Sequence, residues 1–225
     1  MRGKLYKNVR EKIADTAMDL PAAAAFLKEH ARKSFDETVE LHIALGVDAG
    51  KSDQMVRGNV VLPEGAPKQK RIVVFTADAA QQEAAKKAGA ARAGGDDLIA
   101  DIEKNGIADI DGAIATPDMM PKIAKIAKIL GPKGLMPNPK TGTVTPDVAS
   151  AVSELAAGKV SFKMDVQGNI HAAVAKAIWD TEKTVKNAQA VIDAVKVARP
   201  AAQKGAFFRK VVLKTTMSPA VKISM

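Results

Sequence analysis

The hydrophobic pattern of this 225-residue chain changes twice, and its first and last parts share a pattern that the middle lacks. In ETVELHIALGV, residues 37–47, apolar side chains fall at every second position, which predicts a half-buried strand. RIVVFT, residues 71–76, is instead a continuous apolar run, typical of a strand buried on both faces of a parallel sheet. Alternation returns in residues 159–176, where Gln167-Gly168-Asn169 is a turn signal that predicts a hairpin. The two ends of the chain are therefore expected to fold together.

The outer parts also carry helix and strand signals. Pro21 opens a helical Ala-rich stretch, and residues 181–200 form an amphipathic helix that Pro200 ends. A second strand is expected in MVRGNVVL, residues 55–62, and one or two strands in residues 205–225.

The middle part alternates strands and helices. A helical stretch at 79–88 follows the apolar run, and DGAIATP then predicts a second strand. We expect one continuous helix over residues 117–130, with Lys122, Lys125 and Lys128 on its solvent face, and a further helix to about Ala156. This order is typical of a small parallel α/β unit.

These patterns predict an α/β protein of two domains. The terminal domain is discontinuous, of the α+β split β-α-β type, and comprises residues 1–65 and 158–225. A Rossmann-like three-layer α/β domain, residues 68–156, is inserted into it. Proline and glycine in residues 63–69 indicate a linker, so two strands of chain cross between the domains and a hinge is expected near 63–69 and 156–159.

Positive charge is concentrated at the end of the chain. The net charge is +9, and residues 157–225 hold 12 basic and 4 acidic residues, a net of +8, with no acid after Asp193. This asymmetry indicates a polyanionic partner, nucleic acid first and an anionic membrane second. The alternative is a basic surface that only keeps the protein soluble.

Composition excludes several classes of protein. The chain has no cysteine, which rules out disulfides, thiolate zinc sites and iron–sulfur clusters, and its three histidines lack metal-ligand spacing. No metal or cofactor is therefore expected. The first residues have no apolar signal region and no stretch reaches about 18 apolar residues. We expect a soluble, cytoplasmic protein, monomeric when free, with no membrane partner.

The segment ILGPKGLMPNPKTGTV, residues 129–144, is a rigid proline- and glycine-rich loop bearing Lys133 and Lys140. Such a loop could cradle phosphate, but the Walker spacing is absent and no strand directly precedes it. The alternative function is a cytosolic α/β enzyme that binds a nucleotide or phosphorylated metabolite at residues 131–142.

The same loop closely resembles the signature of the large-subunit ribosomal protein number one family, the protein of the mobile ribosomal stalk, bacterial type. Residues 34–63, 168–176 and 214–223 resemble further segments of that family in the expected order. The resemblance spans nearly the whole chain and implies two α/β domains, the outer one made from both chain ends.

The resemblance implies a ribosomal structural protein and not an enzyme. Its implied partners are large-subunit rRNA of the stalk region, the exit-site tRNA whose release it assists, and its own mRNA, which it represses. The implied RNA-binding residues lie in four segments of the terminal domain: Phe35, Glu37, Thr38, Arg57, His171, Lys176, Thr215, Thr216, Met217 and Ser218.

The residue types suit RNA. Phe35 can pack on a base or ribose, threonine hydroxyls can bond 2′-hydroxyls and phosphates, and Arg57 and Lys176 can contact phosphates. Ser218 departs from the glycine usual in the family, and its side chain could crowd an RNA backbone. Without the resemblance, Phe35 would be read as a core residue and His171 as a satisfied strand histidine.

Overall fold

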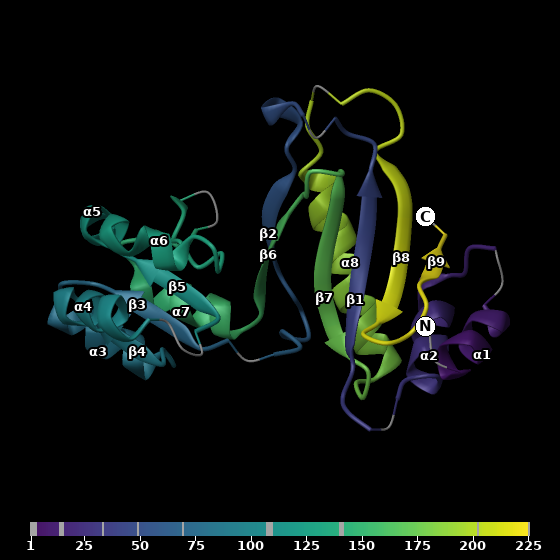
Figure 1. Ribbon diagram of the computed structural model, residues 1–225, viewed down its shortest axis with the longest axis horizontal. Helices are drawn as coiled ribbons and strands as arrows, with labels where there is room; N and C mark the ends of the chain where they lie inside the picture. Colours follow the sequence, from purple (N-terminus) through teal and green to yellow (C-terminus); the bar gives the residue numbers. More distant parts are fainter. Residues whose placement is uncertain are drawn as a thin grey trace. The chain divides into compact units, whose positions relative to one another are not determined.

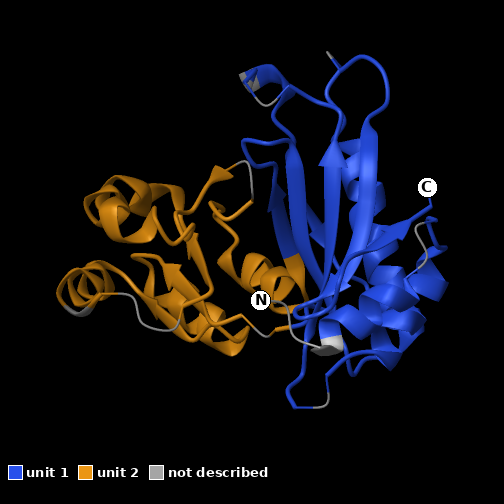
Figure 2. Ribbon diagram, turned by 45° about the vertical axis from the view of Figure 1, so that its right-hand side comes forward, with its two compact units in different colours: residues 1–67, 160–225 blue, residues 68–159 orange. Residues whose placement is uncertain are grey.

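A computed structural model describes residues 4–13, 16–32, 34–48, 50–68, 70–106, 110–139, 142–201 and 203–224. The chain forms two compact units: unit 1 comprises residues 1–67 and 160–225, and unit 2 comprises residues 68–159 (Figure 2). The predicted fold class, two α/β domains of which the first is discontinuous, is confirmed.

Unit 1 is built around a four-stranded antiparallel sheet with the order β7-β1-β8-β9. Its strands are β1 (Thr38–Leu45), β7 (Asn169–Lys176), β8 (Phe208–Thr215) and β9 (Val221–Ile223). Strand β1 lies in the centre, and its alternate residues Val39, Leu41, Ile43 and Leu45 are buried. The period-two pattern therefore identified both the strand and its core face.

Helices cover that core face, and α8 lies behind the sheet in the view of Figure 1. The helices of unit 1 are α1 (Lys4–Lys12), α2 (Leu20–Glu29) and α8 (Thr181–Val197), with the short 3₁₀ helix η1 (Ser52–Gln54) between β1 and β2. The buried stripe of α8 includes Val191 and Val195, as its amphipathic pattern predicted. Asn187 is also fully buried on α8, and its side chain bonds the carbonyls of Val174 and Gly65 and the amide of Glu64.

The predicted hairpin over residues 159–176 is wrong in its pairing. The chain does reverse at Asp165, whose carboxylate accepts from the amides of Gln167 and Asn169 at 2.8 Å. However, β6 (Lys159–Lys163) pairs with β2 (Arg57–Val61) in a separate two-stranded sheet, and β7 pairs with β1. Turn residues specify a reversal, whereas the strand partner is decided by which edge buries the alternating apolar face.

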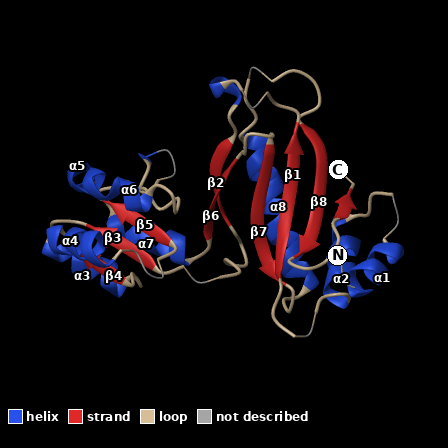
Figure 3. Cartoon of the chain, viewed as in Figure 1, coloured by secondary structure: helices blue, strands red, loops and turns tan. Residues whose placement is uncertain are grey.

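Unit 2 has three layers, as expected for a Rossmann-like domain. Its parallel sheet has the order β4-β3-β5. The strands are β3 (Ile72–Phe75), β4 (Arg92–Gly94) and β5 (Gly112–Ala115), and the longer helices are α3 (Ala79–Lys87), α4 (Asp96–Asn105) and α7 (Val148–Ala156) (Figure 3). Val73 and Phe75 join one hydrophobic cluster, while Ile72 and Val74 join another that includes α3 and α7. Burial on both faces explains the continuous apolar run.

Two details of unit 2 differ from the sequence prediction. Strand β4 has only three residues and contains a glycine, so its pattern gave no strand signal. Residues 117–130 are not one helix but η2 (Pro117–Met119), α5 (Met120–Ile123), η3 (Ala124–Ile126) and α6 (Ala127–Leu130). The isoleucines of this segment recur every third residue, a spacing that suits the 3.0-residue turn of a 3₁₀ helix better than the 3.6-residue turn of an α-helix.

Candidate nucleic-acid interface

Three segments of unit 1 meet at one end of the four-stranded sheet: the entry to β1, the end of β7 and the turn after β8. Pairing places Thr38 opposite Lys176 and Val39 opposite Thr215. The structure thereby brings together most of the predicted residues, which lie far apart in sequence: Phe35, Glu37, Thr38, Lys176, Thr215, Thr216, Met217 and Ser218.

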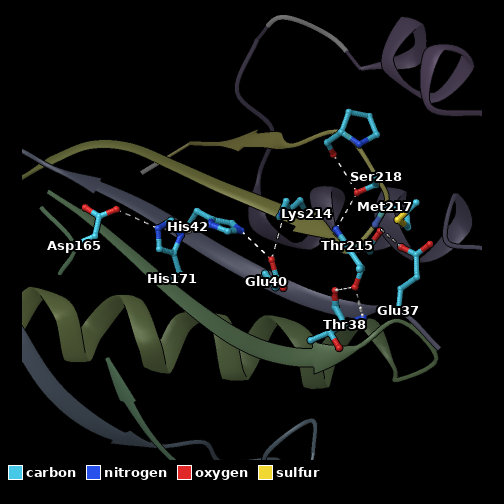
Figure 4. Close-up of polar contacts among 12 residues, drawn as sticks. Glu37, Thr38, Glu40, His42, Asp165, His171, Lys214, Thr215, Met217 and Ser218 are labelled. Carbon is cyan, nitrogen blue, oxygen red and sulfur yellow. Dashed lines mark hydrogen bonds and ion pairs between the residues drawn. The ribbon is translucent and has the colours of Figure 1, made fainter. Parts of the chain in front are cut away.

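Glu37 is buried in this cluster and links two of its segments by hydrogen bonds. It is 1% exposed, and its carboxylate accepts from the backbone amide of Arg32 at 3.2 Å. The carboxylate also accepts from the backbone amide of Met217 at 3.4 Å (Figure 4). Its own carbonyl accepts from the amide of Ala177 at 2.8 Å. One acidic residue therefore holds the entry to β1 against the turn after β8. Phe35 and Met217 lie on these two segments and are 45% and 43% exposed.

Thr38, Thr216 and Lys176 form a second set of contacts. The Thr38 amide donates to the Thr216 hydroxyl at 3.1 Å, and the Lys176 ammonium donates to the Thr38 hydroxyl at 3.1 Å. Lys176 also lies 3.9 Å from the carboxylate of Asp36. Since a partly exposed ion pair of this kind is worth at most about 1 kcal/mol, Lys176 can exchange it for a phosphate at little cost.

The turn after β8 uses the side chain of Ser218 internally. Its hydroxyl accepts from the amide of Thr215 at 2.9 Å and donates to the carbonyl of Pro219 at 3.1 Å. The serine that departs from the family pattern thus closes its own turn. Thr215 is fully buried, and its hydroxyl has no hydrogen-bond partner within the described ranges.

A polar row crosses the open face of the same sheet, and sequence reasoning named only one of its members, His171. His171 lies opposite His42 on β1, with the ring centroids 4.7 Å apart and a hydrogen bond between their Nδ1 atoms (Figure 4). Glu40 contacts His42 at 3.2 Å and Lys214 at 3.4 Å. Period-two alternation on β1 was the signal that could have found this row, because residues 38, 40 and 42 point away from the core.

The surroundings of His42 lower its pKa from the usual value. Burial is the largest cause, and the positive charges of His171 and Lys214 act in the same direction, while Glu40 opposes them. His42 is therefore neutral at pH 7 in the free protein.

Arg57 is not part of the cluster. It is exposed and begins β2, which belongs to the two-stranded sheet and follows the far end of β1.

Within its described residues, the loop at residues 131–142 does not have the geometry of a phosphate cradle. Several of its backbone amides are bonded inside the loop: Gly134 donates to Gly131, Leu135 to Leu130, and Gly142 to Pro139. Lys140 lies outside the described residues. Across the described ranges, no group of three or more histidine or acidic residues could hold a metal ion, and no helix is long and apolar enough to cross a bilayer.

Comparisons with known proteins agree with the sequence resemblance. Residues 27–219 match the model of the Ribosomal protein L1p/L10e family. The chain is 50% identical to the large ribosomal subunit protein uL1 of Mycolicibacterium vanbaalenii, over 98% of this chain and 93% of that protein. It is 47% identical to the proteins of the same name from Thermobifida fusca, over 99% and 94%, and from Persephonella marina, over 100% and 94%. These relatives are structural ribosomal proteins, so the alternative of a nucleotide-binding enzyme is wrong.

Proposed function

The chain belongs to the Ribosomal protein L1p/L10e family, as a structural constituent of the large ribosomal subunit, and we propose that unit 1 binds structured large-subunit rRNA. The proposed surface, called here the sheet-end surface, comprises Phe35, Thr38, Lys176, Thr216 and Met217. Glu37, Thr215 and Ser218 position these residues, His171 lies on the open face of the same sheet, and Arg57 would be a separate RNA contact on β2.

The observation that carries this proposal is the pair of exposed apolar side chains held by one buried acid. Glu37 bonds the backbone amides of Arg32 and Met217, so the two segments that carry Phe35 and Met217 are joined before any partner binds. The exposed ring of Phe35 offers a face on which a base can stack, and stacking contributes about 1–3 kcal/mol per base.

Basic side chains supply the sequence-independent part of binding. Lys176 adjoins Thr38, and Lys214 adjoins Glu40 on the open face of the sheet. Alternation along β8 and β9 places Lys210 and Lys222 on the same face. Each phosphate contact made by such a lysine releases counterions, so the affinity should fall steeply with salt.

The finer roles are also part of the proposal. We infer that the RNA is the stalk region of large-subunit rRNA, that the protein assists release of tRNA from the exit site, and that it represses its own mRNA through a similar RNA structure. Unit 2 would then move on the two linkers near 63–69 and 156–159. Support for this comes from the family membership and from the two crossings of the chain between the units.

The test is binding of a stalk rRNA fragment by the full chain across a salt series. The double variant Phe35→Ala with Met217→Ala should bind about 10- to 100-fold more weakly at every salt concentration, since at least one stacked base is lost. Its salt slope should not change, because no charge is removed. The matched control is Val197→Ala, an exposed apolar side chain at the end of α8. Binding that ignores both RNA folding and the double substitution would reject the proposed surface.

A further inference from the structure

Two histidines on neighbouring strands of unit 1 lie side by side on the open face of the sheet, and the proposed function gives His42 no role. His42 on β1 is opposite His171 on β7, and their Nδ1 atoms share a hydrogen bond (Figure 4). A carboxylate lies at each end of the pair. Glu40 is 3.2 Å from Nε2 of His42, and Asp165 is 3.5 Å from Nε2 of His171. These four side chains, called here the histidine row, are joined by three polar contacts.

The number of ring protons decides how many of these contacts can form at once. A contact between an imidazole nitrogen and a carboxylate needs a proton on that nitrogen, and a contact between two nitrogens needs one proton between them. The three contacts therefore require three ring protons. Two neutral imidazoles carry only two, one on each ring, whereas one imidazole and one imidazolium carry three. The histidine row is complete only when the pair of histidines has taken up one extra proton.

Charged groups on this face of the sheet act on that extra proton in opposite directions. Glu40 and Asp165 favour it. Hydrogen bonds from the amides of Asn169 and Gln167 lower the pKa of Asp165, so this carboxylate stays ionised. Four lysines on the same face oppose the extra proton: Lys176, Lys210, Lys214 and Lys222. Burial opposes it as well and is the largest cause of the lowered pKa of His42, so the free protein holds the extra proton weakly.

A phosphate on this face changes the balance. Without the extra proton, a phosphate beside the pair would be repelled by the carboxylates of Glu40 and Asp165, whereas with it the phosphate would meet an imidazolium, a charge-assisted donor. His171 is the accessible member, because its side chain is 54% exposed, against 22% for His42. Its 3.5 Å contact with Asp165 is long for a hydrogen bond, so Nε2 can bond a phosphate instead. Phosphate binding and proton uptake therefore favour each other.

We propose that the histidine row is a phosphate subsite of the RNA-binding surface, and that the His42–His171 pair takes up one proton when an RNA phosphate binds there. The inference rests on the proposed function, because the RNA supplies the phosphate. It adds a titrating contact to a surface whose other cations, the lysines, stay charged at neutral pH. The affinity for RNA should therefore rise as the pH falls, by at most about tenfold per pH unit for one proton.

The first test is the dissociation constant of the full chain for a stalk rRNA fragment, measured from about pH 8 to about pH 6 at one salt concentration. The wild type should gain about three- to tenfold in affinity over this range. The double variant His42→Gln with His171→Gln should lose this gain, because glutamine stays polar but cannot take up a proton. The matched control is His30→Gln, which removes the third histidine of the chain, at the end of α2, and should keep the gain. Circular dichroism at each pH checks that all variants are folded.

Calorimetry in two buffers with different heats of ionisation counts the protons directly. Near pH 7 the wild type should take up a measurable fraction of one proton for each RNA bound, and the double variant should take up less. The RNA is the same in every titration, so its own protons cancel in the comparison. Wild-type binding without pH dependence, or equal pH dependence in the double variant, would overturn this inference alone. No binding by the wild type at any pH would overturn the proposed function as well.

Discussion

Replacing Glu37 with alanine tests whether one buried carboxylate organises the sheet-end surface. The variant loses two hydrogen bonds from backbone amides, at 3.2 and 3.4 Å, to a charged acceptor that is 1% exposed. Bonds to charged groups contribute about 1.5–3 kcal/mol, and these are long, so we take about 1.5 kcal/mol each. The free energy of unfolding of unit 1 should fall by about 3 kcal/mol, which for a unit of this size lowers the Tm by roughly 12 °C.

The assay combines thermal unfolding with amide hydrogen exchange. Exchange at Arg32 and Met217 should accelerate about tenfold, since each amide loses its acceptor. Glu40→Ala is the matched control, because Glu40 is partly exposed and its carboxylate contacts the side chains of His42 and Lys214. The Glu40→Ala substitution should lower the free energy of unfolding by less than about 1 kcal/mol. A loss below 1 kcal/mol in Glu37→Ala, or unchanged exchange at both amides, would refute the reasoning.

Three other changes have defined outcomes. Asn187→Ala removes three hydrogen bonds of a fully buried amide, so the free energy of unfolding, measured by chemical denaturation, should fall by about 3 kcal/mol. Gln189→Ala, on the exposed side of α8, is the control and should lower it by less than about 0.5 kcal/mol. Thr215→Val removes a buried hydroxyl without a described partner, so stability should stay level or rise, by up to about 1 kcal/mol, and a clear loss would contradict the burial argument. The pKa of His42 is lowered from 6.5 on folding, so the unfolded chain takes up the proton first as pH falls. Stability measured against His42→Gln should therefore decrease below about pH 6.5, and a difference independent of pH would contradict this.

Much of the fold could be predicted because local patterns agree with it. Alternation over residues 37–47 identified the central strand, and the uninterrupted apolar run at 71–76 identified a strand with a layer on each face. The pairing of strands that are distant in sequence could not be predicted from local patterns. The turn at Gly168 was visible, but whether β6 pairs with β7 or with β2 depends on edges supplied by distant segments.

The sequence predicted several residues of the candidate site but not how they contact one another. Family resemblance named Phe35, Glu37 and Met217, but not that Glu37 is buried and bonds the backbone on both sides. That role needs residues 180 positions apart in sequence to be adjacent. Likewise, His42 was passed over as a strand residue, because only the pairing of β1 with β7 sets it opposite His171.

The most direct test of the central claim is hydrogen exchange of the full chain with and without a stalk rRNA fragment. We expect RNA to slow exchange in residues 34–38 and 214–218 of unit 1 and to leave exchange in residues 131–142 of unit 2 unchanged. Slowed exchange confined to 131–142, with none at the sheet-end surface, would contradict it.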